Sequence, residues 1–559
     1  MIFKLNPNKL IYIIAGIFSP IVIYINRFLV PDQSFDTVNY HVFLGFKGLS
    51  NFFLPFNGRE FYPSGLFSFS TFFDSINYVF INLVGYRIGN IGSLISYILI
   101  VIAVYKIVQL FDAQFFNKVK LKNIILFVSI VTVHELLFEV ATYFVEGVST
   151  ALVLWGFLLL FTFYKKVIDK KNYSKIDLFK FLLGNILIGI SVYGKQTNLM
   201  YLPACILVNT YIAWILFRVH YGSKKIFVHL LFLPNLALFG FVSIYGVINY
   251  LETKNPFFPF YNAIFKSEYY PPISFENRLF GGLNFPEKVL WPIVSFFQPE
   301  RLGEVHDMFN DYKLNIYIIL SVLILIFLKK VKTGKFEKLF ILVFITSALF
   351  WSFMFGYVRY ATALEIIGGL TLLLLVNKKV LFFNSKPAVI LLLIFLIFQN
   401  IRIIKFNLTY DYSWRPTINN DWLVVKQQLP YLFAKEQSLP DEIAVELRAV
   451  DLTLNCSHPH TLYQTLSPLR GKPTLLIDNS ASGGLTSTKQ FQLKSQSMID
   501  LKVGQRYGVI VPYFGLSANY EKCVNAIKQK GYTIAKEYNI DNFLGSTSTK
   551  LKIILGEIR

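Results

Sequence analysis

Residues 1–404 form long apolar runs that alternate with short polar or aromatic segments. A helix that crosses the hydrocarbon core of a bilayer needs about 20 apolar residues, and most of these runs approach that length. The pattern predicts a mainly α fold, a polytopic membrane helix bundle with about 11 spans. The predicted spans are 10–30, 88–110, 123–140, 147–164, 181–196, 199–217, 227–250, 314–328, 339–357, 360–376 and 387–404.

Two segments between the runs are long, residues 31–87 and residues 251–313, and we expect both on the outer side of the membrane. Both are rich in Phe, Tyr and Pro, a composition that argues against disorder. Aromatic rings at this level suit the interfacial belt of a membrane protein, and they also suit stacking on sugar rings. The sequence does not separate these two roles.

The pattern changes from Tyr410 onward, where apolar residues are interspersed with Asp, Lys, Ser and Gln. Alternating positions predict strands at 507–512, 533–538 and 550–554, and 519–530 has the period of a helix. Gly531 is a plausible stop for that helix. We therefore predict two parts. They are a transmembrane module at residues 1–404 and a small C-terminal extracytoplasmic mixed α/β domain at residues 405–559.

Composition and charge agree with a membrane protein. The chain has 559 residues, of which 16% are charged, whereas soluble domains average about 25%. The net charge of +21 comes largely from lysine clusters in every second loop. This is the positive-inside pattern, so the excess predicts orientation and not a nucleic-acid partner. The clusters are Lys118 to Lys122, Lys165 to Lys180, Lys224 with Lys225, Lys329 to Lys338, and Lys378 with Lys379.

The charge pattern predicts a multi-pass protein of the cell (inner) membrane with a cytoplasmic N-terminus. No small-residue cleavage site follows the first run, so we interpret this run as a retained helix. Cys205 lies in an apolar run and suits an inert core position. Cys456 and Cys523 both fall in the predicted outer domain, where a disulfide persists once formed, but the sequence leaves their pairing open.

The first outer loop begins with acidic residues. Asp32, Asp36 and Tyr40 share a face if the segment is helical, because they are spaced four residues apart. A carboxylate at the lipid–water boundary can accept a proton from an attacking hydroxyl. The alternative is that these aspartates cap a helix.

A second acidic group follows the third run. Glu135, Glu139 and Glu146 lie close to one face if residues 134–146 form a continuous helix. Acids beside a membrane helix are costly unless they face water, protein or a cation. An interfacial loop is the simpler explanation for any one of them.

Cations lie near the outer ends of several spans. Lys195 follows an apolar run that is short for a span, and Arg359 and Arg87 occupy similar outer positions. Cations at this level suit a phosphate or diphosphate on a lipid carrier, and Arg offers bidentate geometry. Snorkelling to the interface is the alternative for Lys195.

Taken in order, several motifs resemble those of bacterial membrane glycosyltransferases of the C superfamily (GT-C). This group contains the protein O-mannosyltransferases and the lipid A aminoarabinose transferases. The resemblance covers about residues 10–404 and implies a GT-C type of helix bundle. The motifs are FDTVNYH at 35–41, ATYFVE at 141–146, GKQT at 194–197, NPFFPFYN at 255–262 and the pair Arg359-Tyr360. At Glu146 the family more often has Asp.

The resemblance implies transfer of a sugar from a polyprenyl-phosphate donor to an acceptor hydroxyl of a glycan, lipid or protein at the outer membrane face. It implies that Asp36 is the general base or orients the hydroxyl, and that Glu146 assists by holding the acceptor or a metal ion. Lys195, Arg359 and, more weakly, Arg59 then neutralise the leaving phosphate. The expected substrate-binding residues are Asp32, Tyr40, His41 and Glu139.

Family members differ in metal dependence, so a divalent metal stays open and neither His41 nor His134 is assigned as a ligand. Three alternatives also stay open. An O-antigen or polysaccharide polymerase or ligase usually depends on Arg and His in its large outer loop. A transporter of lipid-linked glycans has ionisable residues and broken helices near the bilayer midplane. A non-catalytic relative only binds glycan.

Overall fold

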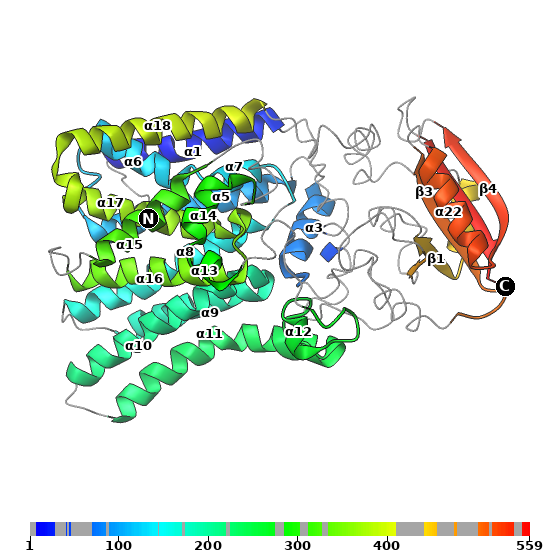
Figure 1. Ribbon diagram of the computed structural model, residues 1–559, viewed down its shortest axis with the longest axis horizontal. Helices are drawn as coiled ribbons and strands as arrows, with labels where there is room; N and C mark the ends of the chain where they lie inside the picture. Colours follow the sequence, from blue (N-terminus) through cyan, green and yellow to red (C-terminus); the bar gives the residue numbers. More distant parts are fainter. Residues whose placement is uncertain are drawn as a thin grey trace.

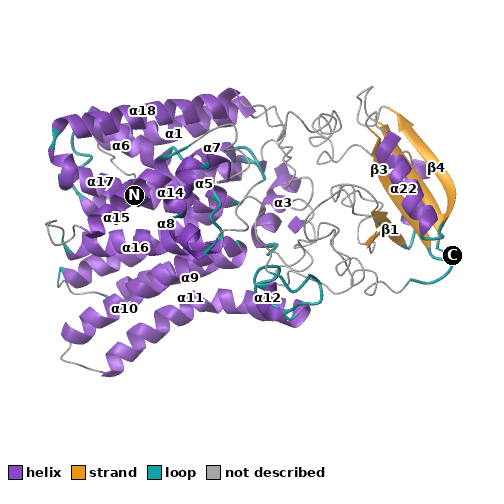
Figure 2. Ribbon diagram, in the orientation of Figure 1, coloured by secondary structure: helices purple, strands orange, loops and turns teal. Residues whose placement is uncertain are grey.

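The computed structural model divides into a helical bundle and a small C-terminal sheet (Figures 1 and 2). The predicted class, mainly helical with a small α/β part, is confirmed. The described residues are 7–27, 41, 44–45, 70–84, 89–143, 145–169, 174–219, 224–273, 284–301, 311–326, 334–409, 441–455, 474–477, 501–513, 517–541 and 550–558.

Among these residues, nine helices are long and apolar enough to cross a membrane, and each coincides with a predicted span. The protein is thus a multi-pass membrane protein. The long helices are α1 (Pro7–Arg27), α5 (Ile91–Phe111), α8 (Glu146–Ile168), α9 (Lys175–Gly194), α10 (Leu202–Val219), α11 (Lys224–Thr253), α16 (Lys335–Met354), α17 (Thr362–Asn377) and α18 (Lys386–Thr409).

The other two predicted spans correspond to shorter apolar helices. The run 314–328 forms α15 (Lys313–Ile326) as far as it is described, and the run 123–140 divides into α6 (Leu121–Val131) and α7 (His134–Phe138). The backbone leaves the helical region at Thr132, which separates α6 from α7.

The acidic residues of this region do not lie on one helix. The interpretation of residues 134–146 as a continuous helix is therefore wrong. Glu135 lies in α7, Glu139 ends that helix, and Glu146 begins α8. Between them the backbone turns at Ala141, which has a φ of 68°. Glu139 and Glu146 therefore approach each other across a turn.

Parts of the two long loops are helical, which the sequence pattern did not predict. The turn η2 follows α9 after the single residue Lys195, and η4 directly precedes α17. Asp32, Asp36, Tyr40 and Arg59 lie outside the described residues. The short elements are α3 (Phe72–Val84), α12 (Asn262–Phe265), α13 (Phe285–Val289), α14 (Trp291–Phe297), η2 (Gln196–Tyr201), η3 (Pro299–Arg301), η4 (Val358–Ala361) and η5 (Leu381–Asn384).

The core of the bundle lies around α8 and α17. Every residue of α17 from Thr362 to Val376 is buried, and the helix packs against α6, α15 and α16. α8 packs closely on α9 where Gly156 and Gly184 face each other, and a Cβ on either would lie 2.9 Å from the carbonyl oxygen of the other. Small residues permit such approach between membrane helices.

Amide side chains connect α9, α10 and α11 inside the bundle. The Asn209 amide donates to the side-chain oxygens of Asn185 at 2.7 Å and Asn235 at 3.0 Å. Hydrogen bonds between helices in apolar surroundings contribute roughly 0.6 to 2 kcal/mol.

We expect Asn209→Leu to lower the free energy of unfolding by about 1 to 2 kcal/mol, because it removes both interhelical bonds. Thermal unfolding in detergent measures the effect. Asn26→Leu, at an exposed position that bonds to a single carbonyl, is the matched control and should change less. Equal stability of Asn209→Leu and the native chain would contradict the assignment.

The C-terminal sheet has the strand order β2-β1-β3-β5-β4. β1 is parallel to β2 and β3, whereas β5 is antiparallel to β3 and β4. α22 packs on the sheet and ends just before Gly531, as the sequence predicts. The elements are α20 (Asp441–Arg448), β1 (Leu452–Asn455), β2 (Thr474–Leu476), β3 (Arg506–Tyr513), α22 (Ser517–Gln529), β4 (Thr533–Asp541) and β5 (Lys550–Glu557).

The cysteines differ in state. Cys523, on α22, is buried and disulfide-bonded. Cys456, the partner that the sequence suggests, lies outside the described residues. Cys205 is free and buried, in agreement with an inert core position.

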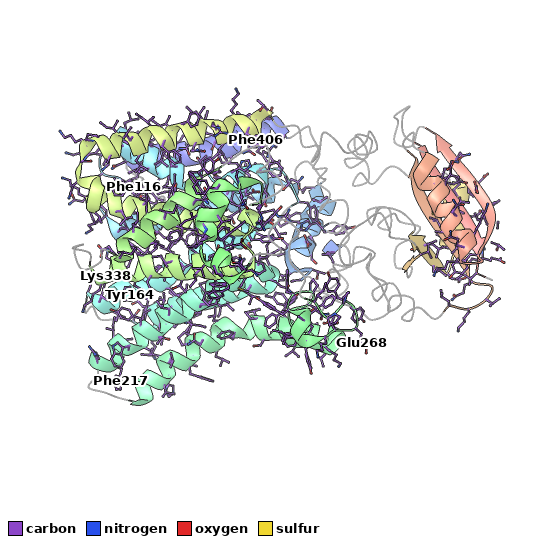
Figure 3. All side chains as sticks on the ribbon, viewed as in Figure 1. Phe116, Tyr164, Phe217, Glu268, Lys338 and Phe406 are labelled. Atoms are coloured by element: carbon purple, nitrogen blue, oxygen red, sulfur yellow. The ribbon has the colours of Figure 1, made fainter. Side chains whose placement is uncertain are left out.

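The ends of the bundle can be followed in Figure 3. Lys338 and Phe217 lie at one end, and Glu268 and Phe406 lie at the other, which is the end nearer to α3 and the C-terminal sheet. This arrangement fits the alternation of loops that the lysine clusters predict. The orientation of the two ends in the cell stays a prediction.

Candidate functional site

A cavity of about 570 Å³, counting its open mouth, lies where α3, the start of α8, the end of α9 and η4 meet. Several of the residues that the sequence singled out line it. The lining residues are His41, Leu44, Ser70, Asp74, Val145, Gly194, Lys195, Gln196, Thr197, Phe260, Arg359 and Tyr360.

The side chain at the centre of the site is Glu146, which is 2% exposed. The Lys195 ammonium donates to its Oε1, and Nε of Arg359 lies 3.3 Å from the same oxygen. Glu146 is also the first residue of α8, where the partial positive charge of the helix terminus favours an anion. Two cations and a helix end thus surround one buried carboxylate.

Lys195 and Arg359 both lie at helix ends and not within the long helices. α9 ends at Gly194, where a Cβ would collide with the ring of Phe73, so the close contact requires glycine. The backbone is extended at Lys195 before η2 begins, which turns the lysine side chain away from the axis of α9. Arg359 lies in η4, immediately before α17.

The cations face the cavity more than the carboxylate does. The side chains of Lys195 and Arg359 are each 13% exposed. The Lys195 nitrogen lies 5.4 Å and the Arg359 guanidinium carbon 5.7 Å from the centre of the Tyr360 ring, within the range of cation–π attraction. The cavity therefore presents positive charge to a ligand.

Two polar residues next to the cations, Gln196 and Thr197, also line the cavity. The Gln196 amide nitrogen donates to the Tyr245 hydroxyl, but its amide oxygen has no hydrogen-bond partner among the described residues. The Thr197 hydroxyl also has none within that part of the chain. Both residues line the cavity, although these two oxygen atoms are themselves buried.

A histidine and an aspartate lie in contact on another side of the cavity. Nδ1 of His41 lies 2.7 Å from Oδ1 of Asp74, and the two residues are 5% and 4% exposed. The Tyr143 hydroxyl donates to the Asp74 carbonyl oxygen at 3.0 Å. Burial raises the pKa of Asp74, and the adjacent His41 acts in the opposite direction.

Glu139 is a second buried acid, close to Glu146. It is 3% exposed, and neither carboxylate oxygen has a hydrogen-bond partner among the described residues. It interacts electrostatically with Glu146, Lys195 and Arg359. It also lines a second polar cavity of about 440 Å³, together with Asn77, Asn90, Ser93, Ser96, Tyr97 and Thr142.

Arg27, at the end of α1, holds the turn that carries Glu139. Its guanidinium donates to the carbonyl oxygens of Leu137, Phe138 and Val140 at 2.9 to 3.1 Å. It also donates to the backbone carbonyl of Asn407 on α18 at 2.9 Å. Arg27 therefore fixes the end of α7 relative to the first and last long helices.

The loop after α11 is folded around two fully buried asparagines. The Asn255 amide donates to the Phe260 carbonyl at 2.9 Å, and the Asn262 amide donates to the carbonyls of Tyr270 and Pro271, both at 2.9 Å. Phe260 lines the cavity. The NPFFPFYN segment at 255–262 thus contributes Phe260 to the lining of the cavity.

The structure brings together Glu146, Lys195, Arg359 and His41, with Glu139 next to them. His134 lies elsewhere, 3.3 Å from the Asn407 amide and against the Phe406 ring. Within the described ranges, no group of three or more His, Cys, Asp or Glu side chains is arranged to hold a metal ion.

The site also contains residues to which the sequence analysis assigned no role, namely Asp74, Gln196 and Thr197, and Arg27 positions the turn that carries Glu139. Gln196 and Thr197 follow Lys195 directly, so their position in the GKQT motif was an available signal. Asp74 and Arg27 had no comparable signal, since their partners are distant in sequence.

No protein-family model matches the chain, and no curated protein sequence matches it. The solved structures that are similar to it include two at 11% identity, each covering 98% of this chain and 97% of the other. They are ArnT from Cupriavidus metallidurans in the apo state, with a TM-score of 0.45, and the same protein bound to undecaprenyl phosphate, with a TM-score of 0.48. The likeness extends over nearly the whole chain but is distant, so the function has to rest on the residues of this chain.

Proposed function

We propose that the protein is a membrane glycosyltransferase that moves a sugar from a polyprenyl-phosphate-linked donor to an acceptor hydroxyl at the outer face of the membrane. One observation carries the proposal. Lys195 and Arg359 converge on the buried Glu146 carboxylate, and both cations face one cavity at the ends of membrane helices.

This arrangement suits a leaving phosphate. As the bond between the sugar and the phosphate breaks, negative charge grows on the phosphate oxygens. Lys195 and Arg359 are already oriented by Glu146, so they stabilise this charge without further reorganisation. Glu146 also screens the two cations from each other while the cavity holds no anion.

The position of the cluster favours this function over transport. Glu146 begins α8, Lys195 follows the last residue of α9, and Arg359 precedes α17. Secondary transporters place their substrate and ion sites near the middle of the membrane. A site at helix ends instead suits a lipid headgroup that lies at the interface.

Roles for Asp32, Asp36, Tyr40 and Arg59 stay predictions. In this proposal Asp36 acts as general base or orients the acceptor hydroxyl. A divalent metal stays open in this proposal, and the described residues form no metal site of their own. The acceptor is a hydroxyl of a glycan, a lipid or a protein.

The test measures binding of undecaprenyl phosphate to the purified protein in detergent, with undecaprenol as the uncharged comparison. We expect Lys195→Met and Arg359→Met each to weaken phosphate-lipid binding by about tenfold or more, since a hydrogen bond to a charged group contributes roughly 1.5 to 3 kcal/mol. Binding of undecaprenol should not change.

Arg402→Met is the matched control, because Arg402 lies on α18 beside Phe398 and does not line the cavity. The native chain should also release undecaprenyl phosphate from at least one donor in a panel of undecaprenyl-phosphate-linked sugars. Equal affinity of the native chain for undecaprenyl phosphate and undecaprenol would overturn the proposal.

A further inference from the structure

The contact between His41 and Asp74 has no role in phosphate binding as described above. Both side chains are more than nine-tenths buried, and both line the cavity that contains Lys195 and Arg359. The Nδ1–Oδ1 distance of 2.7 Å is that of a charge-assisted hydrogen bond. The aspartate therefore fixes the orientation of the imidazole ring.

The backbone around the pair is held by a third residue. The Tyr143 hydroxyl donates to the Asp74 carbonyl, and its ring lies against His41 with centroids 6.2 Å apart. Tyr143 itself lies in the turn that leads to Glu146. Tyr143 therefore links the His41–Asp74 pair to the segment that carries Glu146.

We propose that His41, oriented by Asp74, is the general base that takes the proton from the acceptor hydroxyl. This inference rests on the proposed function and deepens it. It leaves Asp36 with the second of its two predicted roles, the orientation of that hydroxyl.

The acceptor oxygen forms a bond to the anomeric carbon of the donor sugar, and the bond from that carbon to the phosphate oxygen breaks. The electron pair of the broken bond leaves with the polyprenyl phosphate, which Lys195 and Arg359 hold. The hydroxyl proton passes to the neutral imidazole of His41, and the Asp74 carboxylate stabilises the resulting imidazolium. Water then removes the proton.

The two acids close to Lys195 and Arg359, Glu146 and Glu139, are less suited to this step. The Oε1 of Glu146 accepts from Lys195 and lies beside Arg359, so this oxygen is already occupied by two cations. Glu139 lines the second cavity and not the one that contains the cations. A histidine has an ordinary pKa of about 6.5, which suits a base that works near neutral pH.

The charged and titratable groups that surround the ring come from several elements. Asp74 and Glu146 carry negative charge near it, and both interact with His41 electrostatically. Lys195 and Arg359 line the same cavity and oppose protonation of the ring. The pH at which His41 is protonated therefore depends on all four groups. Of these, Asp74 is the one that contacts the ring directly.

The experiment compares native protein, His41→Asn and Asp74→Asn, using the undecaprenyl-phosphate sugar that the native chain turns over. The asparagine in His41→Asn keeps a donor for Asp74 but has no basic nitrogen. We expect its turnover to fall by about 10² to 10⁴-fold, with the acidic limb of the pH–rate profile lost. Its affinity for undecaprenyl phosphate should stay within about twofold of native, because Lys195 and Arg359 remain.

Asp74→Asn should shift the acidic limb to lower pH, because the ring loses the anion that stabilises its protonated form. His229→Asn, at an exposed position on α11, is the matched control and should leave rate and profile unchanged. If His41→Asn loses lipid binding as well, the shift in Asp74→Asn decides the question.

The outcomes separate the two proposals. If native protein turns over no donor in the panel, the transferase function itself fails. If native protein is active and His41→Asn keeps its rate and its acidic limb, the function stands and the assignment of His41 as base is wrong. An unshifted limb in Asp74→Asn would equally reject the role of Asp74.

Discussion

Glu146→Gln is expected to lower both stability and turnover strongly. The variant keeps the size of the side chain but removes the charge that pairs with Lys195 and Arg359. Removing one partner of a buried ion pair costs about 3 to 5 kcal/mol, and we expect the lower end because the two cations retain some contact with water. Turnover should fall by at least about 100-fold, since the cations lose their fixed orientation.

A phosphate ligand should partly restore the stability of this variant. In the absence of the Glu146 charge, undecaprenyl phosphate supplies the anion between two unpaired cations. Binding to the folded state alone stabilises it by mass action. The increase in melting temperature on adding undecaprenyl phosphate should therefore be larger for Glu146→Gln than for the native chain.

Glu337→Gln is the matched control for Glu146. Glu337 pairs with Lys378 at 3.3 Å, but the Lys378 side chain is 47% exposed. Exposed ion pairs contribute about 0 to 1 kcal/mol, so the control should unfold almost like the native chain. If the Glu146→Gln variant is as stable and as active as this control, Glu146 does not hold Lys195 and Arg359 in the orientation that the reaction needs.

Lys313→Met is expected to have a comparable effect on stability without involving the cavity. Lys313 is fully buried at the start of α15, and its ammonium lies 2.8 Å from Glu365 Oε1 and 3.7 Å from Asp311 Oδ2. It also donates to the Thr132 carbonyl. Its removal leaves two buried carboxylates without their cation, which costs about 3 to 5 kcal/mol.

The double variant Lys313→Met with Glu365→Gln should recover part of this loss, because one of the uncompensated charges is removed with its partner. Thermal unfolding in detergent measures all variants. Lys378→Met, from the exposed pair, is the control and should change stability by less than about 1 kcal/mol. If the double variant is no more stable than Lys313→Met, the effect of Lys313 does not come from its charge.

The long helices were predictable because the signal for a membrane span is local. An apolar run of sufficient length determines a helix wherever its neighbours lie. The break after α6 was not predictable, since Val131-Thr132-Val133 contains neither Gly nor Pro. There the helix end is stabilised by Lys313, a residue distant in sequence whose ammonium bonds to the Thr132 carbonyl.

Glu146, Lys195 and Arg359 could be singled out from the sequence as candidates, but their pairing could not. Lys195 and Arg359 stood out because each is a charge at the end of an apolar run. Their convergence on Glu146 depends on how α8, α9 and α17 pack, which periodicity alone does not specify. Asp74 could not be recognised as part of the site, because its significance comes from its contact with His41 in a loop without periodic pattern.

The clamp made by Arg27 bears on how the protein is assembled during synthesis. One guanidinium joins α1, the first long helix, to the end of α7 and to Asn407 on α18, the last one. The turn that carries Glu139 is therefore not fully held until α18 has entered the bilayer. In a nascent chain that ends before α18, Arg27 can still bond to the end of α7 but lacks its contact with Asn407.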